Sequence, residues 1–523
     1  MKRIKKILLV LSLILLVFGI TACKKTDVDK IYREEYPKND IYYQIFVRSF
    51  ADSNGDGVGD INGIINKLDY LEDLGVTALW LSPIHPTTSY HGYEISNYYE
   101  INPEFGTMAD FENLVSEAKK KDIKIVMDTV FNHTADNNNW YLDALDNPNS
   151  KYREYYIWRT NVPGAHSYET FPHSRDLNLR SEAVIAELIN ILKFYSEKGV
   201  AGFRFDAVKH FFGEKPYNPS YSTQPSFEGG QLLATLKNGI KDEYPDVYFV
   251  GENFDYSNNA NEDYYFASDS MFNFAISKYF QTRSYTNMQN ALQRIYNELR
   301  EFNRNFIDAP FITNHDMDRF ASMIDPNNSL DYESLLNKQK LAASILLTLP
   351  GNPYIYYGEE LGMKGKRIEG QEVPGYVDEN GNELIAYDEA RRQPFLWDEN
   401  DKALTTWFPL IHGNDKVRRV GAQIEDEDSL YNHYRKMIEL RKANPALRYG
   451  NTFLKVDGIS SAVAFVRYVE VGEYKQYVLV IHNTSNVEKE VSFDVVKDLY
   501  GTQVIPPMGT YVAEISSLEK VSQ

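Results

Sequence analysis

The feature that most constrains the fold is a regular alternation of short apolar segments with helical patterns. Helical spacing of leucine and isoleucine separates the apolar segments, as in the run 61–74. A strand followed by a helix, repeated eight times, predicts an α/β fold, a parallel (β/α)8 barrel with its functional groups at the carboxyl ends of the strands. The eight predicted strands are 41–50, 76–83, 123–131, 202–207, 247–253, 269–274, 311–316 and 353–359.

Two intervals are too long to be ordinary connections between barrel elements. Residues 133–178 follow the third strand, and we expect a small inserted domain there, beside the mouth of the barrel. Residues 361–428 follow the eighth strand as a second excursion, and a helix at 430–447 should then close the barrel. Beyond Gly450 apolar and polar residues alternate, as in 464–466, 477–480 and 491–495, which predicts an antiparallel β domain. The predicted organisation is a barrel over 39–132 and 179–447, an inserted domain over 133–178 and a C-terminal β domain over 448–523.

The amino terminus carries an export signal. Four basic residues precede an apolar run of 14 residues, 7–20, which is shorter than the about 20 residues that a membrane-spanning helix needs. Cys23 follows Ile20-Thr21-Ala22, and this segment resembles a bacterial lipobox. We therefore expect removal of residues 1–22, lipidation of Cys23, and a polar tether over 23–38 that holds the exported protein on the extracellular face of the membrane. A plain secretory signal with an incidental cysteine is the alternative.

The charge of the chain excludes one class of partner. Asp and Glu number 74 against 55 Lys and Arg, a formal charge of -19, and this excess would repel a nucleic-acid backbone. We expect a monomer without a nucleic-acid partner. Because Cys23 is the only cysteine, no disulfide can form within the chain, and a bound metal is the first candidate for holding long loops.

Four predicted strands end in acids, histidines or an arginine instead of turn residues. In a barrel these ends surround one mouth, where clustered carboxylates are costly unless they are paired or used. Arg204 and Asp206 lie two residues apart on one strand and face the same way, which keeps Asp206 ionised. An ionised carboxylate beside a protonatable one is what retaining glycoside hydrolysis needs, at a separation of about 5–5.5 Å. The four ends are 128–133, 202–210, 251–253 and 313–316.

These four segments, in this order, resemble the signature regions of the α-amylase superfamily, glycoside hydrolase family 13. The resemblance runs from Asn39 to the carboxyl terminus and includes His91-Gly92-Tyr93 and the segment 356–362. It implies a catalytic barrel with an inserted domain and a C-terminal antiparallel β-sandwich. It also implies α-glucan polysaccharides or oligosaccharides as substrates.

The resemblance gives each matching residue a role. Asp206 matches the nucleophile, Glu252 the acid/base, and Asp316 the third carboxylate, which in the family binds sugar hydroxyls most strongly in the transition state. Asp128 is expected to be structural. One competing interpretation makes these residues strand-end caps, and another is a barrel that only binds glycans, which should lack one of the three carboxylates. The residues that match substrate-binding positions are Tyr93, His133, Arg204, Lys209, His210 and His315.

The linkage that is cleaved depends on the residues after the nucleophile. The segment 207–210, Ala-Val-Lys-His, resembles the branch that acts on α-1,4 bonds, whereas oligo-1,6-glucosidases usually have valine directly after the nucleophile. Endo-acting α-1,4-glucan hydrolysis is therefore expected. Glu94 and Asn97 depart from the aspartates usual in the family, and the longer Glu94 favours an open cleft. An oligo-1,6-glucosidase, a cyclomaltodextrinase and a transglycosylase remain alternatives.

The loop after the first strand has the pattern of a calcium site. It offers oxygen donors at alternating positions with a glycine for the sharp turn, and hard oxygen donors suit Ca²⁺. It is no EF-hand, because Gly63 stands where a bidentate glutamate would be needed. The same loop binds calcium in relatives that resemble oligo-1,6-glucosidase; the alternative is a glycine-rich turn in which Asp60 caps the next helix. The expected ligands are Asp52, Asn54, Asp56, the Val58 carbonyl and Asp60.

The superfamily has a second calcium position. It involves the residue that matches Asn132 and an acid of the inserted domain, for which Asp176 is the candidate here. The other ligands of that position have no counterpart that we could assign, so we do not expect it to be occupied.

Overall fold

The computed structural model describes residues 39–159, 164–167, 171, 173–213, 215, 222–303, 306–377, 381–471 and 473–521. The predicted signal, Cys23 and the tether lie outside these residues. Within them, no helix combines the length and the apolar character that crossing a bilayer requires.

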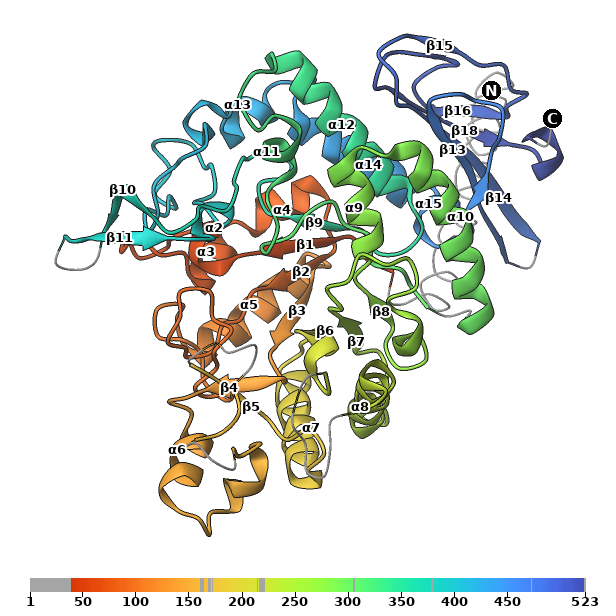
Figure 1. The fold of residues 1–523 in the computed structure, drawn as a ribbon. Helices are drawn as coiled ribbons and strands as arrows, with labels where there is room; N and C mark the ends of the chain where they lie inside the picture. Colours follow the sequence, from red (N-terminus) through yellow and green to blue (C-terminus); the bar gives the residue numbers. More distant parts are fainter. Residues whose placement is uncertain are drawn as a thin grey trace, which may run out of the picture.

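A curled parallel sheet forms the centre of the molecule (Figure 1). Across the described residues its strands pair in the order β8-β7-β6-β3-β2-β1-β9. Parallel bridges from Phe272 to Ala309 and from Phe311 to Tyr354 connect the two ends of this row and close the barrel. The predicted fold class is thereby confirmed. The strands are β1 (Tyr42–Ile45), β2 (Ala78–Leu81), β3 (Lys124–Thr129), β6 (Gly202–Phe205), β7 (Tyr248–Gly251), β8 (Ser270–Met271) and β9 (Tyr354–Tyr356).

Two predicted strands are wrong in part. The first ends at Ile45, and α2 (Val47–Phe50) follows, because the Val47 N–H donates to Ser82 Oγ (3.1 Å) and turns the chain away from the sheet. The seventh, predicted over 311–316, pairs only at Phe311. Its remaining residues leave the sheet, and the Asp316 N–H donates to the Asn314 side chain at 3.0 Å.

Helices cover the outside of the barrel. The predicted helical run 61–74 is divided at Lys67, whose N–H bonds back to the Ile64 carbonyl (3.0 Å). Gly75 ends the second part with φ 94°, a left-handed conformation that glycine adopts without strain. The helix predicted over 430–447 forms as α14 and α15. The main helices are α3 (Ile61–Asn66), α4 (Leu68–Leu74), α5 (Met108–Lys120), α7 (Glu182–Glu197), α8 (Pro225–Ile240), α9 (Phe274–Thr282), α10 (Tyr285–Phe302), α11 (Phe320–Ile324), α12 (Tyr332–Thr348), α14 (Leu430–Ala443) and α15 (Pro445–Arg448).

The excursions lie at the carboxyl ends of the strands. After β3, β4 (His133–Ala135) pairs antiparallel with β5 (Ser174–Asp176), and α6 (Asn139–Asp146) lies between them in sequence, at the lower left of Figure 1. After β9, the hairpin of β10 (Gln371–Val377) and β11 (Glu383–Ala386) projects at the left of the same view. The short helix η5 (Glu389–Arg391) follows it and returns to the mouth.

The C-terminal part is an antiparallel sheet, at the upper right of Figure 1. Arg467 joins it to the barrel, since its guanidinium donates to the Thr348 carbonyl (2.6 Å) and the Leu447 carbonyl (3.2 Å). The predicted strand at 491–495 is wrong, because the Phe493 N–H donates to a Gln503 side chain (2.8 Å) instead of to a neighbouring strand. The strands are β12 (Leu454–Lys455), β13 (Ala462–Val471), β14 (Tyr474–Asn483), β16 (Lys497–Tyr500) and β18 (Thr510–Ile515), with the pair β15 (Lys489–Glu490) and β17 (Val504–Ile505) beside them.

Candidate active site

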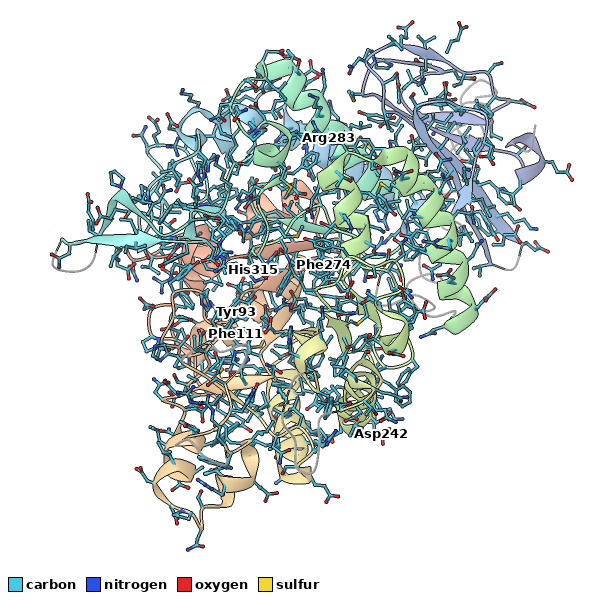
Figure 2. The ribbon with its side chains drawn as sticks, in the orientation of Figure 1. Tyr93, Phe111, Asp242, Phe274, Arg283 and His315 are labelled. Carbon is cyan, nitrogen blue, oxygen red and sulfur yellow. The ribbon has the colours of Figure 1, made fainter. Side chains whose placement is uncertain are left out.

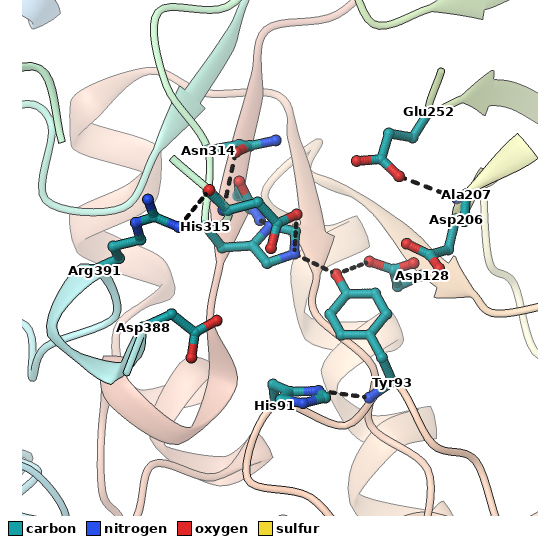
Figure 3. Close-up of polar contacts among 12 residues, drawn as sticks. His91, Tyr93, Asp128, Asp206, Ala207, Glu252, Asn314, His315, Asp388 and Arg391 are labelled. Atoms are coloured by element: carbon teal, nitrogen blue, oxygen red, sulfur yellow. Dashed lines mark hydrogen bonds and ion pairs between the residues drawn. The ribbon is translucent and has the colours of Figure 1, made fainter. Parts of the chain in front are cut away.

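The polar strand ends meet at one mouth of the barrel. Asp128 and Arg204 lie on β3 and β6, Asp206 follows β6, and Glu252 follows β7. Figure 3 shows Asp128, Asp206 and Glu252 on one side of this mouth and His315 on the other, and Figure 2 places the mouth near the middle of the molecule. The structure thus brings together side chains that lie far apart in the sequence.

Arg204 lies at the centre of this group. Its side chain is completely buried, and Nη1 donates to Asp128 Oδ1 at 2.8 Å and to Asp206 Oδ1 at 2.7 Å. Nη2 lies 3.2 Å from Glu252 Oε2, an ion pair that lacks hydrogen-bond geometry. One guanidinium therefore compensates the negative charge of carboxylates from three neighbouring strands.

The acidities of Asp206 and Glu252 are linked. Burial raises the pKa of both carboxyls, Arg204 lowers both, and the negative charge of Glu252 raises the pKa of Asp206. Such a pair holds one proton over a range of pH. The net pKa shift is upward for both carboxyls and stronger for Asp206. We nevertheless assign the charge to Asp206 and the proton to Glu252, because of the two only Asp206 has a hydrogen bond with Arg204 (2.7 Å), whereas Glu252 has the longer ion pair (3.2 Å). The Ala207 N–H also donates to Glu252 Oε2 at 3.0 Å, from a residue with φ 49°.

Asp316 lies across the mouth and keeps 35% of its side chain exposed. Arg392 Nη2 donates to its Oδ1 at 3.0 Å, and His315 Nε2 lies 3.1 Å from its Oδ2. Although burial raises the pKa of Asp316, the positive charges of Arg392 and Arg204 lower it, and the net shift is downward. Asp316 is therefore an anion that faces the mouth.

His315 is held as a neutral ring. Burial lowers its pKa to about 3. Gln44 Nε2 donates to Nδ1 at 2.7 Å, which leaves the ring proton on Nε2, 2.7 Å from the Tyr93 hydroxyl. The Tyr93 hydroxyl in turn donates to Asp128 Oδ2 at 2.9 Å.

Two further predicted residues complete the wall. The Tyr93 ring lies parallel to the His315 ring, 5.4 Å between centroids. His133, whose pKa burial lowers to about 4, places Nε2 3.0 Å from the Tyr93 carbonyl. His133 thus fixes the backbone that carries the tyrosine.

The structure keeps Lys209 and His210 outside this cluster. They lie on the short helix η3 (Val208–His210), directly after the strand that carries Asp206. Lys209 is about half exposed, and its Nζ lies 3.7 Å from Asp255 Oδ2, which follows Glu252 on the next strand end. Both residues therefore occupy the rim between β6 and β7.

Sequence reasoning missed the residues that hold Asp316. Arg392 and Asp388 come from the excursion after β9, where η5 returns to the mouth, and their side chains pair at 2.9 Å. Arg391, beside them, donates to the Asp316 carbonyl at 2.7 Å (Figure 3). The only signal was a pair of arginines next to an acid in a segment with no strand pattern.

A lysine occupies the position of the second calcium. The buried Lys215 donates through Nζ to the Asn132 carbonyl at 2.9 Å and lies 3.4 Å from Asp176 Oδ1. His166 Nδ1 lies 2.5 Å from the other oxygen of Asp176. With an ammonium between the two groups that the superfamily uses, this position does not fit a divalent cation.

The loop 52–60 fits calcium in the type of its donors. Asp52, Asn54 and Asp56 each accept hydrogen bonds from N–H groups of the loop, which closes the turn around their oxygens. Asp60 instead accepts from the N–H groups of Ser53 (2.8 Å) and Gly63 (2.7 Å), so it also caps α3 as the alternative interpretation expected. In the part of the chain that the structure describes, no three acidic, histidine or cysteine side chains are gathered as a metal site. The calcium site therefore stays a prediction.

Comparisons with known proteins agree with this geometry. The alpha-amylase catalytic domain model matches residues 44–450. Alpha-amylase 3 of Dictyoglomus thermophilum is 36% identical over 482 residues, which is 88% of this chain and 88% of the relative. An oligo-1,6-glucosidase of Bacillus cereus is 29% identical over 562 residues, 94% of this chain and 98% of the relative.

The solved structures give the same result. The crystal structure of an alpha-amylase from H. orenii superposes on this chain with a TM-score of 0.76, and its sequence is 32% identical. The match covers 92% of this chain and 100% of the alpha-amylase. Fold, family model and relatives lead to one conclusion: the chain belongs to the alpha-amylase family, glycoside hydrolase family 13, and is an α-glucan hydrolase.

Proposed function

We propose that this hydrolase is an endo-acting α-amylase that cleaves α-1,4-glucosidic bonds with retention of configuration. The observation that supports the proposal is the shared guanidinium of Arg204, which holds Asp206 and Glu252 at 2.7 Å and 3.2 Å. Two carboxyls on one guanidinium belong to one site, as the two-carboxylate mechanism of glycoside hydrolysis requires. Retention of configuration is proposed from the family to which the chain belongs.

The two carboxyls divide the reaction. Asp206 Oδ attacks the anomeric carbon while Glu252 gives its proton to the leaving oxygen, so one ester bond forms as the glycosidic bond breaks. Glu252, now ionised, then takes a proton from water, and the water oxygen displaces Asp206. Asp316 is positioned to bind the sugar hydroxyls while positive charge develops on the ring.

The α-1,4 linkage is supported by the residues beside the nucleophile. Ala207 follows Asp206, and Lys209 and His210 match the family's residues that line the leaving-group side. The alpha-amylase relative is also more similar, at 36%, than the oligo-1,6-glucosidase, at 29%. An oligo-1,6-glucosidase is the second candidate, because that relative matches over 98% of its length.

Asp206→Asn should lower the release of reducing ends from amylose by about 10³-fold or more, since an amide cannot form the ester. Asp69→Asn, the same change at a side chain that is 90% exposed, should keep the wild-type rate. The wild type should give mixed oligosaccharides early in the reaction, as measured by chromatography of the products.

Two outcomes would contradict this assignment. If Asp206→Asn released reducing ends as fast as the wild type, Asp206 could not be the nucleophile. If the enzyme released glucose from isomaltose and did not attack amylose, its specificity would be for α-1,6 and not for α-1,4 bonds.

The pH dependence of kcat/KM should reflect Glu252. This group must be protonated in the first step, and burial raises its pKa above the ordinary 4.5. Activity should therefore persist above pH 4.5 and fall as the pH rises through that raised pKa. The alkaline limb should disappear in Glu252→Gln assayed on α-glucosyl fluoride, whose leaving group needs no proton. An alkaline limb at or below pH 4.5 in the wild type would contradict the assignment of the acid.

We propose that the loop 52–60 binds Ca²⁺ and thereby stabilises the folded protein. Since an ion that binds only the native state raises its stability, excess EDTA should lower the melting temperature. Asp56→Ala removes an exposed donor of the loop, so its melting temperature should no longer respond to EDTA. A wild-type melting curve that EDTA leaves unchanged would be evidence against the site.

We propose that the protein is exported and anchored to the extracellular face of the membrane through a lipid on Cys23. The motivating observation is the lipobox-like segment before the only cysteine. Mass spectrometry of the intact mature protein should show an amino terminus at Cys23 and the added mass of the lipid. A free thiol at this position would contradict the anchor.

A further inference from the structure

The loop 52–60 is joined to the excursion after β9. The Gly57 carbonyl accepts hydrogen bonds from the N–H groups of Thr406 (2.8 Å) and Trp407 (3.1 Å). The Asp52 N–H donates to the Ala403 carbonyl at 3.0 Å. The backbone of this loop therefore sets where Trp407 lies.

Trp407 connects the loop 52–60 to residues nearer the mouth of the barrel, through its contacts with Ser49 and Tyr90. Its indole Nε1 donates to Ser49 Oγ at 2.9 Å, which fixes the plane of the ring. The ring stacks on Tyr90, with 5.5 Å between centroids and 27° between planes. A displaced indole would remove the support of the Tyr90 ring.

Tyr90 bonds directly to the residues that hold the third carboxylate. Its hydroxyl donates to Asp388 Oδ1 and accepts from Arg392 Nη1 at 2.8 Å. Arg392 Nη2 contacts both Asp388 Oδ2 (2.9 Å) and Asp316 Oδ1 (3.0 Å), and Nε donates to the His315 carbonyl at 3.1 Å. Arg392 is almost completely buried, so few other orientations are open to it.

We propose that the loop 52–60 is a positioning element of the active site, which acts through Trp407, Tyr90 and Arg392 to hold Asp316 against the substrate. The inference rests on the proposed role of Asp316 as the carboxylate that binds the reacting sugar. It assigns Trp407 and Tyr90 as positioning residues, since neither has to touch the reacting atoms. It also gives the loop a role in substrate binding, in addition to stability.

Two glycines of the loop provide a matched test. Gly57 has φ +91°, and a Cβ there would lie 2.4 Å from Thr406 Oγ1. Gly55 has φ +85°, and a Cβ there would meet nothing within 4 Å. Alanine causes similar left-handed backbone strain at both positions, but only at Gly57 does the added Cβ meet Thr406, the residue directly before Trp407.

The experiment compares Gly57→Ala, Gly55→Ala and the double variant Gly57→Ala/Thr406→Ala on maltoheptaose at saturating calcium. Gly57→Ala should lower kcat/KM by about 10-fold or more, because displacing a substrate-binding group by a fraction of an ångström is enough for such a loss. Gly55→Ala, which strains the same loop without meeting Thr406, should lose much less activity than Gly57→Ala. In the double variant Oγ1 is gone and the remaining Cβ of residue 406 lies at 3.7 Å, an ordinary contact, so activity should return.

Three readouts separate positioning from general instability. Melting temperatures should be similar for the two single variants, while the intrinsic tryptophan fluorescence should change in Gly57→Ala and recover in the double variant. The loss should appear in KM as well as in kcat, since Asp316 holds the sugar before and during reaction. Trp407→Phe, which keeps a ring against Tyr90, should retain more activity than Trp407→Leu; this pair serves as the test if Gly57→Ala does not fold.

Equal kcat/KM for Gly57→Ala and Gly55→Ala would overturn the proposal, as would a Gly57→Ala defect that the Thr406 change does not repair. Equal activities of Trp407→Phe and Trp407→Leu would also overturn it. Failure of the proposed function is a different result, because the wild type itself would then release no reducing ends from maltoheptaose.

Discussion

The structure of the active site depends on one buried cation. Arg204 has no exposed side-chain surface and compensates Asp128, Asp206 and Glu252, which come from three adjacent strands. Without it, three carboxylates would face one another in a desolvated site, and breaking a buried ion pair of this kind costs about 3–5 kcal/mol. The proposed reaction needs one charged and one protonated carboxyl, and we infer that the hydrogen bond of Arg204 to Asp206, which Glu252 lacks, makes this difference.

The mouth has two sides of different construction. Asp206 and Glu252 extend directly from β6 and β7, so hydrogen bonds of the sheet fix their backbone, as the Asp206 N–H to the Thr129 carbonyl (3.0 Å) shows. Asp316 lies beyond the last paired residue of its segment and is held from outside the barrel, by Arg392 of the excursion. In the proposed reaction, a catalytic pair on rigid strand ends would act with a sugar-binding carboxylate whose place depends on long loops. Such an arrangement lets loop variation change specificity while the chemistry is kept.

Much of the fold and of the site could be predicted from the sequence because the signals are local. Apolar runs that alternate with helical spacing identify the strands, and acids at the strand ends identify Asp206, Glu252 and Asp316. The bend after Ile45 was missed because the apolar run continues to Phe50 although the hydrogen bonds do not.

Long-range pairs could not be predicted in this way. Arg392 meets Asp316 across 76 residues of sequence, and Lys215 meets Asn132 across 83. Neither lysine nor arginine carries a local pattern that names its partner. The pairing appears only when the barrel brings the excursions to one mouth.

The proposed mechanism requires that Asp206 form a covalent bond to the sugar while Glu252 and Asp316 act on the same sugar ring. A fluorinated α-glucosyl fluoride, whose fluorine slows the second step, should inactivate the enzyme and leave one glycosyl group on the protein. Proteolysis and mass spectrometry should locate that group on Asp206. An adduct on another residue, or inactivation without an adduct, would contradict the role of Asp206 as nucleophile.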